Sequence, residues 1–69
     1  MTMYNLFDVV KLKEDNARLG IPSSAIGAIV DILDNGHAYT VEFIDENGDT
    51  YENSLFTDFK EDELEIASK

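Results

Sequence analysis

The sequence predicts a small all-β protein, a barrel of five short strands, and three observations carry this prediction. Apolar and polar residues alternate over 38–44 at the two-residue period of a strand with one buried face. Asn-Gly pairs at 35–36 and 47–48 tolerate the positive φ that tight hairpin turns demand. The runs on either side of these turns are rich in β-branched and aromatic residues, which favour strands. An antiparallel meander is therefore expected.

The first strand is expected over about 7–13, within the run YNLFDVVKLK, because polar turn residues follow it. The next segment, 14–24, holds the only proline, with a glycine before it and two serines after it. This composition predicts an irregular loop rather than a helix. Leu19 and Ile21 are its apolar residues, and we expect them to pin the loop to the core.

The second and third strands are expected over 25–33 and 38–44. Gly27 is expected at a bend or bulge where two backbones approach closely. Glu42 lies between apolar residues of the third strand and should point to solvent. In each strand, alternation predicts that three apolar residues share one face: Ala28, Val30 and Ile32 in the second, and Tyr39, Val41 and Phe43 in the third.

A fourth, less regular strand is expected over 50–56, after the acidic turn at 45–49. The tail fits two interpretations, a helix, or a single helical turn near 58–62 followed by a short strand over 64–66. We favour the second. Five short strands, a long first loop and a helical turn before the last strand describe a small SH3-like barrel. All 69 residues should form one domain, with the barrel core at about 7–66.

Four runs, DVVKLK, IGAIVDIL, YTVEFIDENGDTY and DELEI, carry a resemblance that spans roughly 7–66. They resemble a small bacterial SH3-like barrel family catalogued as a domain of unknown function, whose members have Asp-x-Val near the start and Val-Glu-Phe before a Gly-containing turn. The sequence departs from the usual Gly-Thr-Val at Gly27-Ala28-Ile29. The resemblance implies a compact, non-catalytic protein of the kind that works beside a second small protein in toxin and antitoxin or immunity pairs.

Charge is unevenly distributed along the chain. Fifteen acidic residues face five basic ones, for a net charge of −10. Residues 1–30 hold three of each sign, whereas residues 31–69 hold twelve acidic and two basic residues. Such a field repels phosphate backbones and anionic lipid and attracts cationic surfaces. We therefore expect neither nucleic acid nor membrane as a partner. No apolar run is long enough to span a bilayer, and the expected location is cytoplasmic.

The sequence shows no catalytic or metal-binding pattern. The sole histidine, His37, follows a turn and lies far along the chain from Ser23 and Ser24, so no nucleophile and base are spaced to work together. The acidic turn at 45–49 does not fit the register of an EF-hand calcium loop. There is no cysteine to bind a soft metal or form a disulfide. We expect no enzyme activity and no cofactor.

Protein binding through the acidic half of the chain is the remaining function class. Aromatic residues lie there among carboxylates, and an apolar anchor ringed by charge combines affinity with steering of the partner. The expected partner is a basic, toxin-like protein. The opposite interpretation is that Phe56 and Phe59 simply close the open end of the barrel. The alternative function is an accessory subunit of a larger enzyme or a self-associating barrel. The candidate partner-binding residues are Glu42, Tyr51, Glu52, Phe56, Asp58, Phe59 and Glu61.

Overall fold

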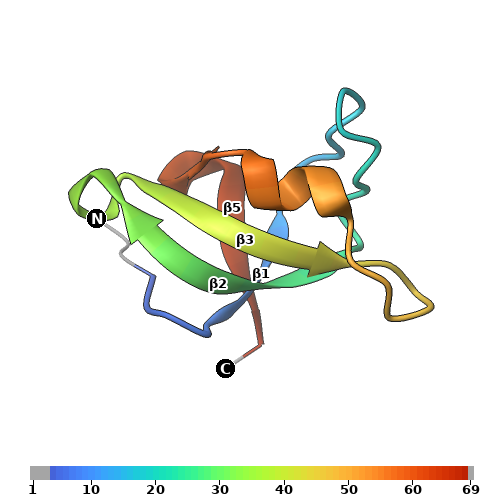
Figure 1. Ribbon diagram of the computed structural model, residues 1–69, viewed down its shortest axis with the longest axis horizontal. Coiled ribbons are helices and arrows are strands. Elements are labelled where there is room, and N and C mark those ends of the chain that lie inside the picture. Colours follow the sequence, from blue (N-terminus) through green and yellow to red (C-terminus); the bar gives the residue numbers. More distant parts are fainter. Residues whose placement is uncertain (1–3, 69) are drawn as a thin grey trace.

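A single antiparallel sheet of five strands wraps around the apolar core (Figure 1). The computed structural model describes residues 4–68. The strand order across the sheet is β4-β3-β2-β1-β5. Three 3₁₀ turns, η1 (Asp34–Gly36), η2 (Glu52–Phe56) and η3 (Glu61–Glu63), connect the later strands. The strands are β1 (Val9–Leu12), β2 (Ile26–Leu33), β3 (Ala38–Ile44), β4 (Phe59–Lys60) and β5 (Leu64–Ser68).

The β2–β3 hairpin is the longest ladder of the sheet. It pairs Ile26 with Ile44 at one end and Leu33 with Ala38 at the other. On β3 the predicted alternation is confirmed in full, because the core side of this strand is completely buried and its bounds are those predicted. The residues of this buried face are Tyr39, Val41 and Phe43.

On β2 the predicted face is wrong, and a β-bulge is the reason. The register shifts between Ile29 and Asp31, so one residue is inserted and the alternation of faces changes there. Ile29 is fully buried, whereas Val30 and Ile32 are 39% and 37% exposed. Ala28 pairs with Glu42 on the outer face of the sheet. The three apolar residues therefore do not form one inward-facing row.

Gly27 lies where β3 approaches the backbone of β2 closely, as its sequence context predicts. A Cβ atom at this position would stand 2.7 Å from Val41 Cγ1 and 2.9 Å from the backbone oxygen of Glu42. Both distances are shorter than ordinary van der Waals contacts, and one of the atoms belongs to the backbone. Glycine is therefore required by the space available, while the bulge itself lies further along β2.

The predicted fourth strand over 50–56 is wrong. After one isolated bridge between Ile44 and Thr50, the chain turns into η2. The cause is Ser54, which is fully buried and accepts a hydrogen bond from the Phe43 backbone N–H through its Oγ, at 3.2 Å. A side-chain oxygen thus occupies the place that a strand carbonyl would take at this edge of β3. The fourth strand is instead β4, which pairs with Ala38 and Tyr39.

The end of the chain confirms the favoured interpretation of the tail. The turn η3 precedes β5, which pairs with β1 through Leu12 and Leu64 and through Lys11 and Glu65. The short strand β4 occupies part of the range where a helical turn was predicted. An all-β fold with five strands and a helical turn before the last one is thus confirmed. Within residues 4–68, no helix is long and apolar enough to cross a membrane.

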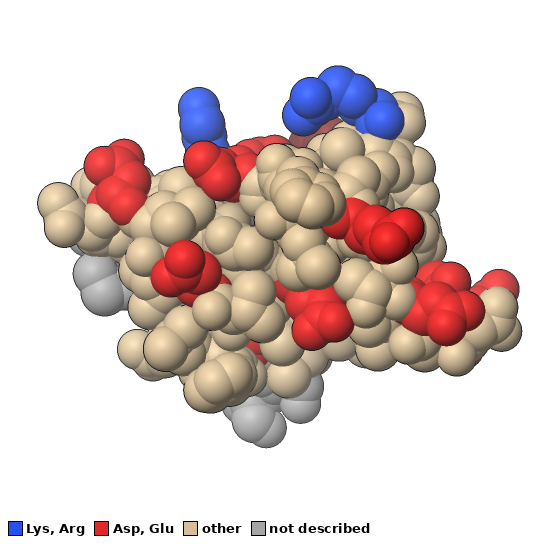
Figure 2. Space-filling model, in the orientation of Figure 1, with Lys and Arg blue, Asp and Glu red and all other residues tan. Residues whose placement is uncertain are grey.

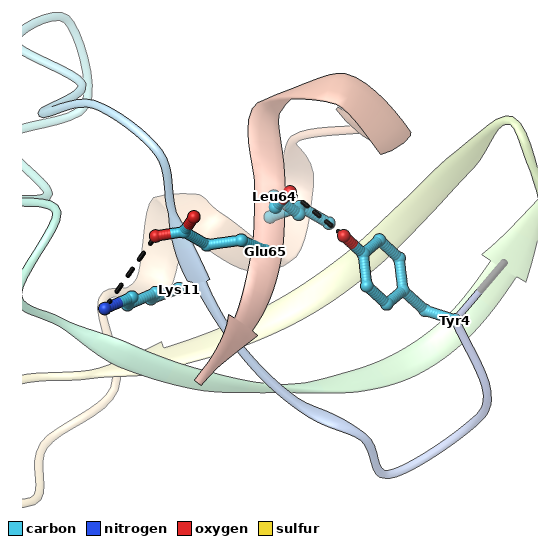
Figure 3. Close-up of polar contacts among 4 residues, drawn as sticks. All are labelled: Tyr4, Lys11, Leu64 and Glu65. Atoms are coloured by element: carbon cyan, nitrogen blue, oxygen red, sulfur yellow. Dashed lines mark hydrogen bonds and ion pairs between the residues drawn. The ribbon is translucent and has the colours of Figure 1, made fainter. Parts of the chain in front are cut away.

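Tyr4 packs in the core near the start of β5. Its ring meets that of Tyr39 edge to face at a centroid distance of 5.4 Å, and its hydroxyl donates to the Leu64 carbonyl at 2.9 Å (Figure 3). Its backbone N–H donates to the Tyr39 hydroxyl at 3.1 Å, and that hydroxyl donates to the Gly36 carbonyl at 2.7 Å. Burial, with smaller contributions from nearby Glu61, Tyr39 and Glu65, raises the pKa of Tyr4. The core therefore begins before the first predicted strand.

The long loop between β1 and β2 is folded on itself and held to the core. Ile21 is 1% exposed, and Leu19 packs against the buried cluster, which confirms their predicted role. The Ser23 backbone N–H donates to Asp15 Oδ1 at 2.7 Å, and this bond lowers the pKa of Asp15. The side chain of Asn53 donates to the Leu19 carbonyl at 2.9 Å and so ties the loop to η2.

Candidate functional site

The candidate partner-binding residues lie along one strand rather than in one cluster. The chain from Tyr51 to Glu61 runs back beside β3, with η2 lying over that strand (Figure 1). Tyr51 N–H donates to the Phe43 carbonyl at one end, and Glu61 N–H donates to the His37 carbonyl at the other. A seven-residue strand is about 20 Å long. We call the resulting set the β3 stripe: Glu42, Tyr51, Glu52, Phe56, Asp58 and Glu61.

Phe56 and Phe59 are three residues apart and have opposite environments. Phe56, at the end of η2, is 89% exposed, so the interpretation that it closes the barrel is wrong. Phe59, on β4, is fully buried and meets Phe43 edge to face at a centroid distance of 5.2 Å. Phe59 is a core residue, and its ring is not available to a partner at the surface of the folded protein. The stripe keeps Phe56 and excludes Phe59.

The remaining members of the stripe are four acidic residues of differing exposure and one tyrosine. Glu52 and Asp58 are exposed on either side of Phe56 in the chain, and Glu61 is half-buried at the start of η3. Glu42 lies on the outer face of the sheet, as predicted, but it is half-buried and accepts a hydrogen bond from Thr50 Oγ1 at 2.9 Å. Tyr51 is half-buried and packs against the core. The stripe therefore offers one freely exposed ring among carboxylates.

Few of the acidic side chains take part in ion pairs. Within residues 4–68 the structure shows one ion pair, between Lys11 Nζ and Glu65 Oε2 at 3.7 Å (Figure 3). Figure 2 shows acidic side chains in several separate places across one face, with basic side chains at its upper edge. The negative field is thus spread over this face rather than concentrated in one patch. Nor do the described residues place three or more potential metal ligands together.

An open groove of about 550 Å³ lies at the open end of the β2–β3 hairpin, beside the acidic turn at 45–49. Two of its apolar lining residues, Ile26 and Ile44, are opposite each other in the β2–β3 ladder and are 48% and 40% exposed. The sequence does not reveal this groove, because its lining residues come from loops that are distant in the chain. The groove is lined by Pro22, Ser24, Ala25, Ile26, Ile44, Asp45, Glu46, Asn47 and Tyr51.

A second exposed apolar area lies before β1 and was also missed. Phe7 is 75% exposed and Leu6 is 48% exposed. Phe7 adopts a φ of 71°, in the left-handed region that bulky residues rarely occupy. Its backbone N–H donates to the Ile29 carbonyl at 2.8 Å, so the backbone of this segment lies against β2 one residue before the exposed Val30. We call Leu6, Phe7 and Val30 the N-terminal apolar area.

Comparison with known proteins bears on the family and not on the activity. No curated protein and no solved structure matches the chain. One family model does match, over residues 6–66, and its description is a domain of unknown function, DUF4926. This match covers nearly the whole barrel, from the segment before β1 into β5. The chain therefore belongs to the DUF4926 family.

Proposed function

We propose that this protein is a non-catalytic, acidic binding module that neutralises a basic partner protein in the bacterial cytoplasm, as an antitoxin or immunity protein does. The observation that carries the proposal is Phe56, an aromatic side chain that is 89% exposed and lies in the chain between the exposed residues Glu52 and Asp58. A large apolar ring left in water contributes nothing to the core of the monomer, whereas aromatic residues are frequent anchors of protein interfaces.

The charge of the chain supports a cationic partner. A net charge of −10, with one ion pair among residues 4–68, repels a second acidic protein and accelerates association with a basic one. Such steering weakens as salt screens the field, because the Debye length falls from about 10 Å at 0.1 M to about 3 Å at 1 M ionic strength. A toxin that acts on nucleic acid has the required positive surface.

The test is co-expression with the products of the adjacent genes, followed by calorimetric titration of any complex at low and high ionic strength. We expect a one-to-one complex whose Kd rises about tenfold or more with salt. Phe56→Ser should weaken binding about tenfold or more, as for an interface anchor. The matched control is Ile32→Ser, which removes an exposed apolar side chain outside the stripe. A complex insensitive both to salt and to Phe56→Ser would contradict the proposal.

A second candidate function is supported by the N-terminal apolar area. Phe7 and Leu6 expose apolar surface in the half of the chain that carries no net charge. Such a surface suits an accessory subunit of a larger enzyme or a self-associating barrel, and the resulting assembly would persist at high salt. Sedimentation of the purified protein at high ionic strength tests self-association. A dimer that becomes a monomer in Phe7→Ser would favour this second function over the first.

A further inference from the structure

The groove at the open end of the hairpin combines an apolar floor with an acidic rim. We call its apolar lining residues, Ile26, Ile44 and the half-buried Tyr51, the floor, and its acidic lining residues, Asp45 and Glu46, the rim. Its volume, about 550 Å³, falls in the range of about 300–1,000 Å³ that is usual for sites that hold a ligand or a few side chains. Such a site can hold an apolar side chain and attract cations at the same time.

Asp45, one of the two acidic residues of the rim, is held in place by the backbone of the turn. Asp45 Oδ1 accepts hydrogen bonds from the backbone N–H groups of Asn47 and Asp49, at 2.8 and 2.9 Å. Asp45 N–H donates to the Asp49 carbonyl at 2.8 Å, so the turn is closed from both sides. Glu46 comes directly after Asp45 and is exposed. A carboxylate whose position is already fixed loses little conformational freedom when a cation binds beside it.

The side chains of the two isoleucines of the floor lie outside the core, where a partner can contact them. They belong to the outer face of the sheet, because the neighbouring Gly27–Phe43 pair faces the core. Pairing across the ladder puts their side chains next to each other. Both remain about half exposed, which leaves apolar area that a partner can cover.

We propose that this groove binds an extended cationic segment of the partner protein. One apolar side chain of the segment packs on Ile26, Ile44 and Tyr51, and lysine or arginine side chains on either side of it lie against Asp45 and Glu46. The inference deepens the proposed function, since it assumes a basic partner and assigns the part of that partner that docks here. Charge complementarity selects this occupant, and Tyr51 makes the groove continuous with the β3 stripe.

The test uses defined peptides and amide NMR spectra of the whole chain. The probe is acetyl-Lys-Lys-Leu-Lys-Lys-amide, and the controls replace its leucine by serine or all its lysines by glutamate. We expect the probe to shift the amide signals of the groove residues. The serine peptide should bind about tenfold more weakly, because the buried leucine is lost. The glutamate peptide should cause no shifts. Equal binding of the leucine and serine peptides, or no binding of the leucine peptide, overturns the proposal.

Variants separate the groove from the rest of the surface. The double change Ile26→Ser and Ile44→Ser alters only half-exposed side chains and should weaken the probe about tenfold. The matched control Ile32→Ser should leave its affinity unchanged. Amide shifts confined to the region of Phe56 would overturn the proposed groove site but not the proposed function. The proposed function is tested separately, by co-expression with the products of the adjacent genes. Shifts of the groove signals on dilution of the protein alone would show a second copy as the occupant and overturn the proposal.

Discussion

The two turns that carry an Asn-Gly pair lead into different structures. After the first, at 35–36, the chain returns as β3 and builds the longest ladder of the sheet. After the second, at 47–48, it makes one bridge at Thr50 and then leaves the sheet as η2. Gly36 and Gly48 both have positive φ, as such turns require, and in the first turn Asp34 and Asn35 have positive φ as well.

The segments that follow the two turns differ as well. β3 alternates without a break, and every second side chain reaches the core. The segment 51–56 places Ser54 where a strand would bury an apolar residue, and this side chain bonds both the Phe43 N–H and the Tyr51 carbonyl. A turn signal permits a hairpin, and the pattern after the turn decides whether one forms. Substitutions in the two regions should therefore have unequal effects.

The largest effect is expected where the returning segment rejoins the core. Phe59→Ala should lower the free energy of unfolding by about 3–5 kcal/mol, because it leaves a cavity beside Phe43. The matched change Phe56→Ala, at a ring that is 89% exposed, should change stability by less than about 0.5 kcal/mol. Urea denaturation measures both values. Similar losses in the two variants would contradict the assignment of these rings to core and surface.

The next effect is expected inside the regular hairpin. Gly27→Ala should destabilise by about 1–3 kcal/mol, because its Cβ overlaps the backbone oxygen of Glu42 and the strands must separate. The control is Gly20→Ala, at a glycine with open space but a φ of 71°, where only the backbone conformation is unfavourable. We expect the Gly20 variant to lose about 1 kcal/mol. A Gly27→Ala protein as stable as the parent would show that the close approach of β2 and β3 is not required.

Ser54→Ala tests why the segment after the second turn is not a strand. The variant leaves the buried Phe43 N–H without its partner, at a cost of about 1–2 kcal/mol. Faster amide hydrogen exchange at Phe43 should accompany this loss. The control Ser24→Ala, at an exposed serine, should be neutral. Unchanged exchange at Phe43 would mean that the Ser54 hydroxyl does not hold the edge of β3.

The smallest effect concerns the first turn, which Tyr39 and Tyr4 hold in place. Folding raises the pKa of Tyr4 above its ordinary value of 10.0, so the folded state favours the protonated phenol. The resulting stability is fully present below about pH 10 and is lost as the pH rises through the folded-state pKa. Thermal unfolding from about pH 8 to about pH 11 should show this loss in the parent. The Tyr4→Phe variant should lose less stability over the same pH range. An identical pH dependence in the two proteins would contradict the assignment of this loss to Tyr4.

Much of the fold could be predicted from the sequence because its signals are local. β3 was predicted to the residue, since its period-two pattern is unbroken. The bulge between Ile29 and Asp31 could not be seen, because an inserted residue leaves no trace until the partner strand fixes the register. The strand expected at 50–56 failed for a related reason. Its apolar residues fit a strand, and only the contact of Ser54 with β3 reveals the turn.

The candidate site was harder to predict, since it depends on which aromatic residues the barrel encloses. The phenylalanines at 56 and 59 have the same local composition, and only the pairing of β4 with Tyr39 turns Phe59 inward. The groove was not visible in the sequence, because Ile26 and Ile44 become neighbours through the ladder. The charge of the chain, by contrast, can be counted without knowing the fold. The excess of acidic residues in 31–69 is the reason for proposing a basic partner.

The contact between Tyr4 and Leu64 has a consequence for the order in which the molecule assembles. The two residues are 60 positions apart, and β1 sits between β2 and the last strand of the chain. Such non-local pairing slows folding, because a long loop must close before the contacts stabilise it. During synthesis on the ribosome, the edge of β1 that pairs with β5 therefore stays unpaired until β5 has emerged from the exit tunnel. The five-stranded sheet is therefore complete only after this strand has been added.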